Sequence, residues 1–296
     1  MDRTKKKLER DSRSEVVKGL ETKKQMKWLL LISLPLLLLL TFYIYPLSKM
    51  LLISLFDPEF TMKHYLHFIK APAYFNILVE TFKMSTSVTI ICLILAYPVA
   101  YLLSQSSPRV SNILMIMVVL PFFTAILVRT YAWMVILGRN GLLNQFLMGI
   151  GLTSSPLKLM HNTIGVHIGM VHILLPFMIL PLYTAMTSID KGLMKAAENL
   201  GANPFQSFIN VFLPLSLPGI GGGSLLVFII ALGFYITPAL LGGVSDVMIS
   251  TFIEIQVNQV VNWGFAAALA VILLTITLIF FSIYNRFFGA DKIMGA

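Results

Sequence analysis

Polar and aromatic side chains interrupt several strongly apolar stretches of this sequence, where a hydrocarbon environment would disfavour them. Carboxylates and aromatic faces together suit a cationic amine, through charge pairing and through attraction between the cation and the ring. Tyrosine and tryptophan also belong naturally at membrane interfaces, so an aromatic residue alone does not specify a binding site. The candidates for a polar solute pathway are Glu80, Thr81, Ser85, Ser87, Tyr131, Trp133, Tyr235, Thr237, Asp246 and Glu254.

Arg129 lies among these candidates but carries the opposite charge. A fixed cation repels a cationic solute, so we expect Arg129 to have a gating or structural role. No metal site is expected, because the five histidines lack acids or cysteines at ligand spacing. The sequence shows neither a nucleotide-binding P-loop nor a cluster of nucleophile and base in the apolar stretches, so the chain is not expected to be an enzyme.

The elements that would carry these residues are apolar runs about 20 residues long, enough to cross a bilayer. Hydrophobic residues make up 57% of the 296 positions and charged residues only 12%. In lipid the backbone must satisfy its own hydrogen bonds, which favours helices. We therefore predict an all-α integral membrane protein with six transmembrane helices, at residues 28–48, 77–104, 110–135, 161–186, 213–238 and 263–285.

Basic residues indicate how these helices are oriented. Residues 1–27 hold ten lysines and arginines against five acids, which predicts a basic cytoplasmic tail near anionic lipid headgroups. With both termini in the cytoplasm, fifteen basic residues lie inside and seven outside, as the positive-inside rule prefers. The predicted six-helix domain covers residues 28–290, and the segment 188–214 is its long cytoplasmic loop. The net charge of +9 has the same origin, and no basic patch interleaved with exposed aromatics points to nucleic acid.

The segment 188–214 has the sequence signals of two short helices joined by a tight turn. Asp190 can cap the first helix, and Gly201 can end it, because glycine adopts positive φ at little cost. Asn203 is a second cap, and Pro204 follows at the first helical position, where its missing N–H costs nothing. Such a projecting helix pair suits docking into a groove of a soluble partner, although an amphipathic interfacial loop has the same pattern.

This segment resembles the cytoplasmic signature of ABC importer permeases. In the order of that signature (Glu-Ala-Ala, three residues, Gly, nine residues, Ile-x-Leu-Pro) the chain has Lys195, Ala196, Ala197, Gly201, Val211, Leu213 and Pro214. The usual acid, which can pair with a basic group of the ATPase, is replaced by Lys195. Either the ATPase compensates for this charge, or Glu198 takes the role of the acid.

The resemblance implies a type I ABC importer permease fold in the bacterial cytoplasmic (inner) membrane. It implies as partners a second permease subunit, more often different than identical, two ATPase subunits that bind ATP and Mg²⁺, and an extracytoplasmic solute-binding protein. This chain would itself hold no cofactor, and residues 188–214 would be its coupling segment in a cleft of the ATPase. The coupling residues would be Lys195, Ala196, Ala197, Glu198, Gly201, Asn203, Pro204, Leu213 and Pro214.

Residues 120–152 and 231–243 are similar to the spermidine/putrescine branch of these permeases. The branch favours a polyamine as solute and leaves opines, amino-acid-like amines and aminophosphonates open. Many similar polyamine permeases have an acid where this chain has Ala239, which weakens the case for a polycation. A stand-alone secondary transporter is the alternative from another class, but inverted repeats and intramembrane relays of ionisable residues are not evident in the sequence.

Overall fold

The computed structural model describes residues 28, 32–56 and 59–288. Their regular structure is helical, with one isolated β-bridge between Phe56 and Phe60. The basic tail predicted for residues 1–27 lies outside the described residues. The chain divides into two compact units, Met1–Phe60 and Thr61–Ala296. Among the described residues, five helices are long and apolar enough to cross a membrane: Ile32–Leu55, Pro72–Gln105, Thr163–Thr187, Pro204–Leu232 and Trp263–Arg286.

The first unit contributes the candidate span Ile32–Leu55. Within it, the π-helical turn η1 (Leu40–Ile44) precedes α2 (Tyr45–Leu55). Pro46 explains the widened turn, because proline has no N–H to donate to the carbonyl four residues earlier. The span was predicted to end at residue 48, but the helix continues to Leu55.

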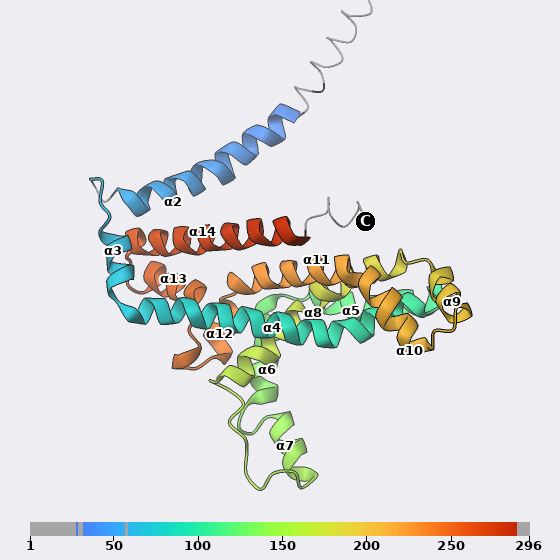
Figure 1. Ribbon diagram of the computed structural model, residues 1–296. Coiled ribbons are helices and arrows are strands. Elements are labelled where there is room, and N and C mark those ends of the chain that lie inside the picture. The colour runs from blue at the N-terminus through green and yellow to red at the C-terminus, as the bar shows by residue number, and fades with distance from the viewer. Residues whose placement is uncertain (1–27, 29–31, 57–58, 289–296) are drawn as a thin grey trace, which may run out of the picture. The chain divides into compact units, whose positions relative to one another are not determined.

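The core of the second unit is formed by α4 (Pro72–Gln105), α8 (Thr163–Thr187) and α11 (Leu213–Leu232), which lie side by side (Figure 1). Small residues allow this close packing, as is usual where lipid removes the hydrophobic drive between helices. A Cβ on Gly223 of α11 would lie 2.9 Å from the sulfur of Met178 on α8. The buried core of these helices includes Val88, Cys92, Ala96, Ala100, Met170, Leu174, Met178, Leu182, Val227 and Ala231.

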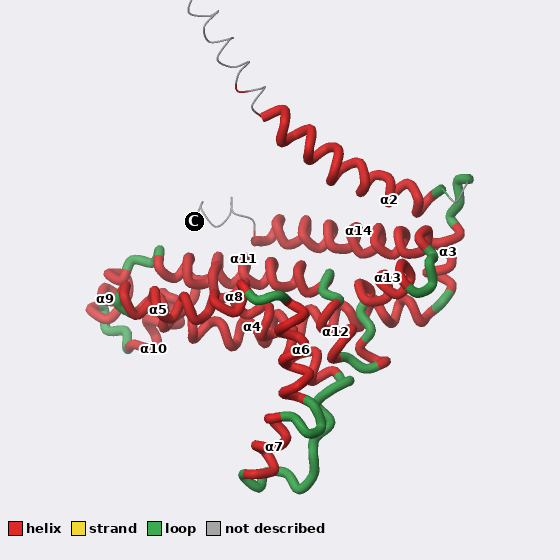
Figure 2. Tube along the Cα trace, turned by 180° about the vertical axis from the view of Figure 1, so that it is seen from behind, coloured by secondary structure: helices red, strands yellow, loops and turns green. Residues whose placement is uncertain are grey.

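A second apolar cluster closes one end of this bundle. It joins α4 to three further helices: α3 (Lys63–Lys70), α13 (Ile249–Asn258) and α14 (Trp263–Phe288). Phe68, Leu78 and Phe265 are among its buried members. Figure 2 shows α3 and α13 at the end of the bundle opposite to α9 (Lys191–Asn199) and α10 (Pro204–Ser207), with α14 running along the bundle from that end. The bundle therefore presents two different ends.

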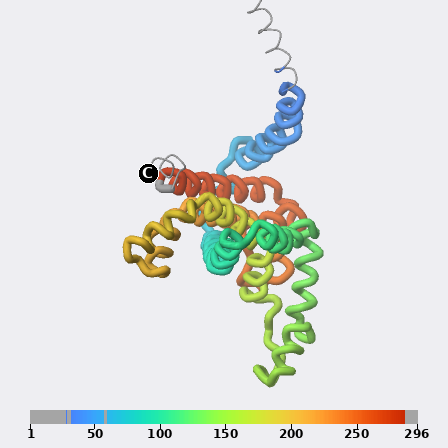
Figure 3. The backbone as a smooth tube through the Cα atoms, turned by 90° about the vertical axis from the view of Figure 1, so that its right-hand side faces the viewer, coloured from blue at the N-terminus to red at the C-terminus, as the bar shows by residue number. Residues whose placement is uncertain are grey.

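The third predicted span is wrong as a single helix over residues 110–135. The chain bends by 96° between Pro108–Phe123 and Ile126–Gly149. Thr124 makes this break, because its N–H and its hydroxyl both donate to the carbonyl of Pro121, at 3.2 and 2.7 Å. Figure 3 shows the second arm leaving the side of the bundle. Six spans result only if the bent pair counts as one; its elements are α5 (Pro108–Val119), η2 (Leu120–Phe123), α6 (Ile126–Leu137) and α7 (Leu142–Gly149).

The fifth span also differs from the predicted range 213–238. Its helix begins at Pro204, passes through the π-helical turn η3 (Phe208–Phe212) into α11, and ends at Leu232. Pro238 has no N–H for the carbonyl of Phe234, and the hydroxyl of Ser250 donates to that carbonyl instead, at 2.6 Å. A separate short helix, α12 (Ile236–Leu241), follows the break.

Candidate functional site

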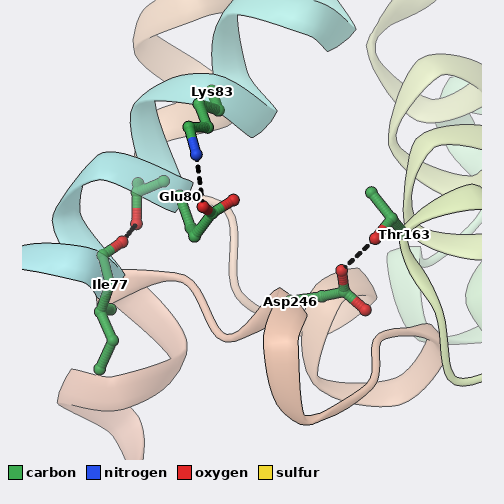
Figure 4. A network of polar contacts seen from close by, with 6 residues as sticks. Ile77, Glu80, Lys83, Thr163 and Asp246 are labelled. Atoms are coloured by element: carbon green, nitrogen blue, oxygen red, sulfur yellow. Dashed lines mark hydrogen bonds and ion pairs between the residues drawn. The ribbon is translucent and has the colours of Figure 1, made fainter. Parts of the chain in front are cut away.

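Two of the predicted pathway acids meet at one cavity, which we call the Asp246 cavity. It has a volume of about 270 Å³ and lies where α4, the start of α8 and the short helix η4 (Val244–Asp246) come together. Figure 4 shows Glu80 and Lys83 on α4, and Asp246 turned towards Thr163 on α8. The lining residues are Glu80, Lys83, Met84, Ser87, Thr163, His167, Asp246 and Met248.

Asp246 is held in place by two hydrogen bonds and is only 6% exposed. The hydroxyl of Thr163 donates to Oδ1 at 2.5 Å, and the N–H of Gly243 donates to Oδ2 at 2.8 Å. Gly243 must be glycine here, because a Cβ would lie 2.6 Å from the carbonyl oxygen of His161. No described lysine or arginine forms an ion pair with Asp246. The carboxylate therefore keeps acceptor capacity that a cation in the cavity can use.

Glu80 is held far more loosely than Asp246. Its carboxylate accepts from the ammonium of Lys83 at 2.7 Å, one helical turn away, and the side chains of Lys83 and Glu80 are 65% and 47% exposed. Pairs of this kind on a helix surface stabilise by only about 0.2–0.5 kcal/mol. A competing cation can therefore displace Lys83 from Glu80.

His167 links α4 to α8 beside these acids. One ring nitrogen, Nδ1, lies 2.7 Å from the carbonyl of Thr163, and the other, Nε2, lies 2.6 Å from the hydroxyl of Ser87. A carbonyl can only accept, so Nδ1 carries a hydrogen in this arrangement. The imidazole is thus fixed at both nitrogens and gives the cavity a rigid wall.

A second group of predicted residues gathers where α6 meets α8 and α12. Thr237 is fully buried, and its hydroxyl lies 3.2 Å from that of Thr130. The indole N–H of Trp133 donates to Nδ1 of His172 at 3.2 Å. Arg129 is 8% exposed, and its Nε and Nη1 are buried without a hydrogen-bond partner. These residues join α6 to the core rather than to the Asp246 cavity.

The remaining pathway candidates do not join either group. Ser85 is fully buried, and its hydroxyl donates to the carbonyl of Thr81 within α4. Tyr131 and Tyr235 are exposed, and Glu254 on α13 accepts from Asn258 at 3.1 Å. Contact of any of these residues with solute stays a prediction.

The segment 188–214 has the local structure that its sequence predicts. Asp190 caps α9 by accepting from the N–H of Gly192 at 2.8 Å. Gly201 has φ +94°, and the N–H groups of Gly201 and Ala202 donate back to the carbonyls of Glu198 and Ala197. This Schellman pattern satisfies the last carbonyls of α9.

The turn then starts the next helix through a reciprocal cap. Asn203 accepts from the N–H of Gln206 at 2.8 Å, while the side chain of Gln206 accepts from the N–H of Asn203 at 3.0 Å. Pro204 occupies the first turn, as predicted. The turn between α9 and α10 is therefore fixed by backbone and cap hydrogen bonds.

This coupling segment exposes large apolar side chains. Leu200 is 90% exposed and Phe205 is 71% exposed. Behind α9 lies a cavity of about 310 Å³, lined by Lys191, Lys195 and Glu198 with residues of α4 and η3. The basic and acidic candidates for an ion pair with a partner therefore lie at one cavity. Exposed apolar side chains of this size are typical of a surface that another protein covers.

Several residues of the Asp246 cavity were not predicted from the sequence. Thr163 and His167 stand one helical turn apart at the start of α8, a spacing that places both on one face. That spacing was the one available signal, because the partners of these residues lie far away in the sequence. Met84 and Met248 are apolar wall residues, and no polar signal marks them.

The comparison with known proteins decides the family. Residues 92–288 match the family described as binding-protein-dependent transport system inner membrane component. The chain belongs to this family. It is accordingly a multi-pass permease subunit of the inner membrane, and the matched range includes the complete coupling segment. The predicted family resemblance and the type I permease fold are confirmed.

Individual relatives agree with this assignment. The chain is 40% identical over 223 residues to the spermidine/putrescine transport system permease protein PotB of Haemophilus influenzae, covering 75% of this chain and 77% of the relative. It is 36% identical over 227 residues to PotB of Escherichia coli, covering 77% and 82%. A bacterial alginate ABC transporter, solved in complex with a pentasaccharide-bound periplasmic protein, has a chain of the same fold, with a TM-score of 0.72 at 18% identity over 89% of this chain and 94% of that chain.

Proposed function

We propose that this permease imports a polyamine such as putrescine or spermidine, and that the amine passes the Asp246 cavity. The observation that carries the proposal is a buried carboxylate, Asp246, that lacks a cationic partner among the described residues and shares a cavity with Glu80. Two carboxylates at one cavity suit the two ends of a diamine. The relatives named as spermidine/putrescine permeases support the same solute class.

The proposal includes partners that supply energy and solute. Two ATPase subunits bind ATP and Mg²⁺ and receive the coupling segment, and a second, different permease subunit completes the pathway. An extracytoplasmic solute-binding protein delivers the amine. The exposed Leu200 and Phe205 support an interface with the ATPase.

The orientation belongs to the same proposal. The excess of basic residues in the tail and the α9 region supports cytoplasmic termini and a cytoplasmic coupling segment. The Asp246 cavity is lined by the N-terminal half of α4 and the start of α8, and in this orientation these parts lie towards the side from which the binding protein delivers solute.

The substitution Asp246→Asn tests the solute pathway. It removes the charge and keeps the shape, so the Thr163 and Gly243 contacts can largely persist. A charged hydrogen bond contributes about 1.5–3 kcal/mol, so we expect putrescine uptake by the reconstituted importer to fall about tenfold or more. Thr275→Ala, which removes a hydroxyl bonded to the carbonyl of Val271 within α14, serves as the control and should leave uptake nearly unchanged. Normal uptake by the Asp246→Asn variant would contradict the pathway.

One observation favours a second solute class. The Nε and Nη1 atoms of Arg129 are buried and unpartnered, and a guanidinium suits a carboxylate. A zwitterionic solute such as an opine or an amino-acid-like amine would pair its carboxylate with Arg129. Two results together would replace the polyamine as the proposed solute. The wild type would take up the zwitterionic solute but not putrescine, and the Arg129→Gln variant would lose this uptake.

A further inference from the structure

We infer that a second cavity, formed by the loops on either side of α7, is a socket for an acidic side chain of the solute-binding protein. This inference rests on the proposed function, which supplies that partner and the side of the membrane. The cavity, here called the basic pocket, has a volume of about 480 Å³. Arg139, Lys158 and His161 line it together with the apolar residues Leu137, Leu159 and Met160.

A buried side chain brings the two strong cations of the basic pocket together. Asn144 on α7 is fully buried, and its amide donates to the carbonyls of Gly138 and Leu157, at 3.1 and 3.0 Å. Its own oxygen accepts from the N–H of Leu157 at 2.9 Å. Gly138 precedes Arg139 and Leu157 precedes Lys158, so one asparagine fixes the backbone beside both cations. The pocket is therefore built by the fold and is not a chance approach of two flexible side chains.

The charge of the basic pocket is not balanced within its surroundings. The sequence contains no aspartate or glutamate from residue 81 to residue 189. The nearby carboxylate of Asp246 is already engaged by Thr163 and Gly243 and lines the other cavity. Arg139, Lys158 and His161 are exposed, and no described carboxylate forms an ion pair with either Arg139 or Lys158. A negatively charged group from another molecule would complete this pocket.

The position of the pocket favours the binding protein as that molecule. In the proposed orientation the pocket lies on the outer side, where basic residues are disfavoured during insertion. The arm that carries it leaves the bundle (Figures 1 and 3), and Leu142, Phe146 and Leu152 of the same arm are exposed. Basic side chains set among apolar ones are the composition of a protein interface in which complementary charge guides the partner into place. A phospholipid phosphate also carries negative charge, and the experiment below distinguishes binding of such a phosphate from binding of the protein partner.

The experiment measures ATPase activity of the complete importer in nanodiscs of zwitterionic lipid, as a function of added putrescine-loaded binding protein. In the double variant Arg139→Glu/Lys158→Glu, we expect the concentration for half-maximal stimulation to rise about tenfold or more. Basal and maximal ATPase activity should stay unchanged, and added salt should weaken stimulation of the wild type more than that of the variant. The single variant Lys158→Glu should shift the curve in the same direction. Lys70→Glu, an equal charge change at an exposed lysine of α3 outside the pocket, is the matched control for this single variant and should shift the curve less than about twofold.

The outcomes separate this inference from the proposed function. If the binding protein stimulates the wild type and the double variant equally, the socket is wrong and the importer assignment stands. If the variants differ only when anionic lipid is present, the pocket binds a lipid phosphate, and the inference is overturned. If the binding protein does not stimulate the wild type at all, the proposed function fails. The milder pair Arg139→Gln/Lys158→Gln should give a smaller shift in the same direction, which guards against misfolding of the charge-reversed protein.

Discussion

Asp246 and Glu80 share a cavity, but different physical constraints act on their carboxylates. Asp246 is buried and held by a hydroxyl and a backbone N–H, so its position is set before a solute arrives. Glu80 is half-exposed and pairs with Lys83 on the same helix face. A preorganised acid beside an adaptable one suits a flexible diamine, because one end can bind at a fixed point while the other end adjusts.

Lys83 offers a prediction at the scale of the residue. Its ammonium donates a hydrogen bond to the carboxylate of Glu80, so it competes with a solute amine for the same carboxylate. The substitution Lys83→Met removes the competitor and keeps an unbranched side chain of similar length. We expect labelled putrescine to bind the purified importer, without binding protein, about 1.4- to 2.3-fold more tightly. The control Lys70→Met should bind as the wild type does, and an unchanged or weaker affinity of the Lys83→Met variant would show that Lys83 does not compete.

Residues that act through near neighbours could be predicted from the sequence, and residues that act through distant ones could not. Gly201, Asn203 and Pro204 were assigned correctly, because each makes its bonds within a few positions. The partner of Asp246 is Thr163, which no local pattern connects to it. Asn144 looks like an ordinary polar residue of a short helix until Gly138 and Leu157 are seen on either side of it.

At the scale of the element, the turn between α9 and α10 is the part whose shape the proposed coupling function most needs. A Cβ on Gly201 would meet nothing within 4 Å, so space is not what demands glycine there. Glycine is favoured at this position because the backbone has a left-handed conformation, with φ at +94°. Left-handed backbone costs a residue with a Cβ about 1–2 kcal/mol, and asparagine tolerates it better than most.

Two substitutions at this position should therefore differ. We expect Gly201→Ala to lower putrescine uptake strongly and to make ATP hydrolysis less dependent on the binding protein, with normal insertion into the membrane. Gly201→Asn should retain more coupling than Gly201→Ala, because its side chain supports positive φ. Uptake and binding-protein-stimulated ATPase activity, measured on the same proteoliposomes, make the comparison. Equal and normal coupling in both variants would show that the turn does not carry the conformational signal.

The two errors in the predicted spans have a common cause. Residues 110–135 and 213–238 are predominantly apolar, and hydropathy indicates how long an apolar stretch is but not where its helix bends or ends. The breaks arise from Thr124, which ends a turn at Pro121, and from Ser250, which takes the carbonyl of Phe234. The second of these bonds joins α13 to the end of α11, so no pattern within the span itself could show it.

At the scale of the whole molecule, the second unit has two chemically different ends. One end presents α9 and α10, which expose apolar side chains, and the other presents α3 and α13 (Figure 2). The Asp246 cavity lies among the N-terminal half of α4, the start of α8 and η4. The continuous helix from Pro204 to Leu232 starts in the coupling segment and runs through the core. We therefore expect a movement imposed on α10 by the ATPase to act on α11, which packs against both α4 and α8.

The most direct test of the account is uptake of labelled putrescine into proteoliposomes that contain this permease, its partner permease and the ATPase subunits, with the binding protein on the outer side. The account predicts uptake that requires both ATP and the binding protein, persists after ion gradients are collapsed, and is inhibited by spermidine. Uptake by this chain alone, driven by an ion gradient in the absence of ATP, would contradict it and would identify a secondary transporter.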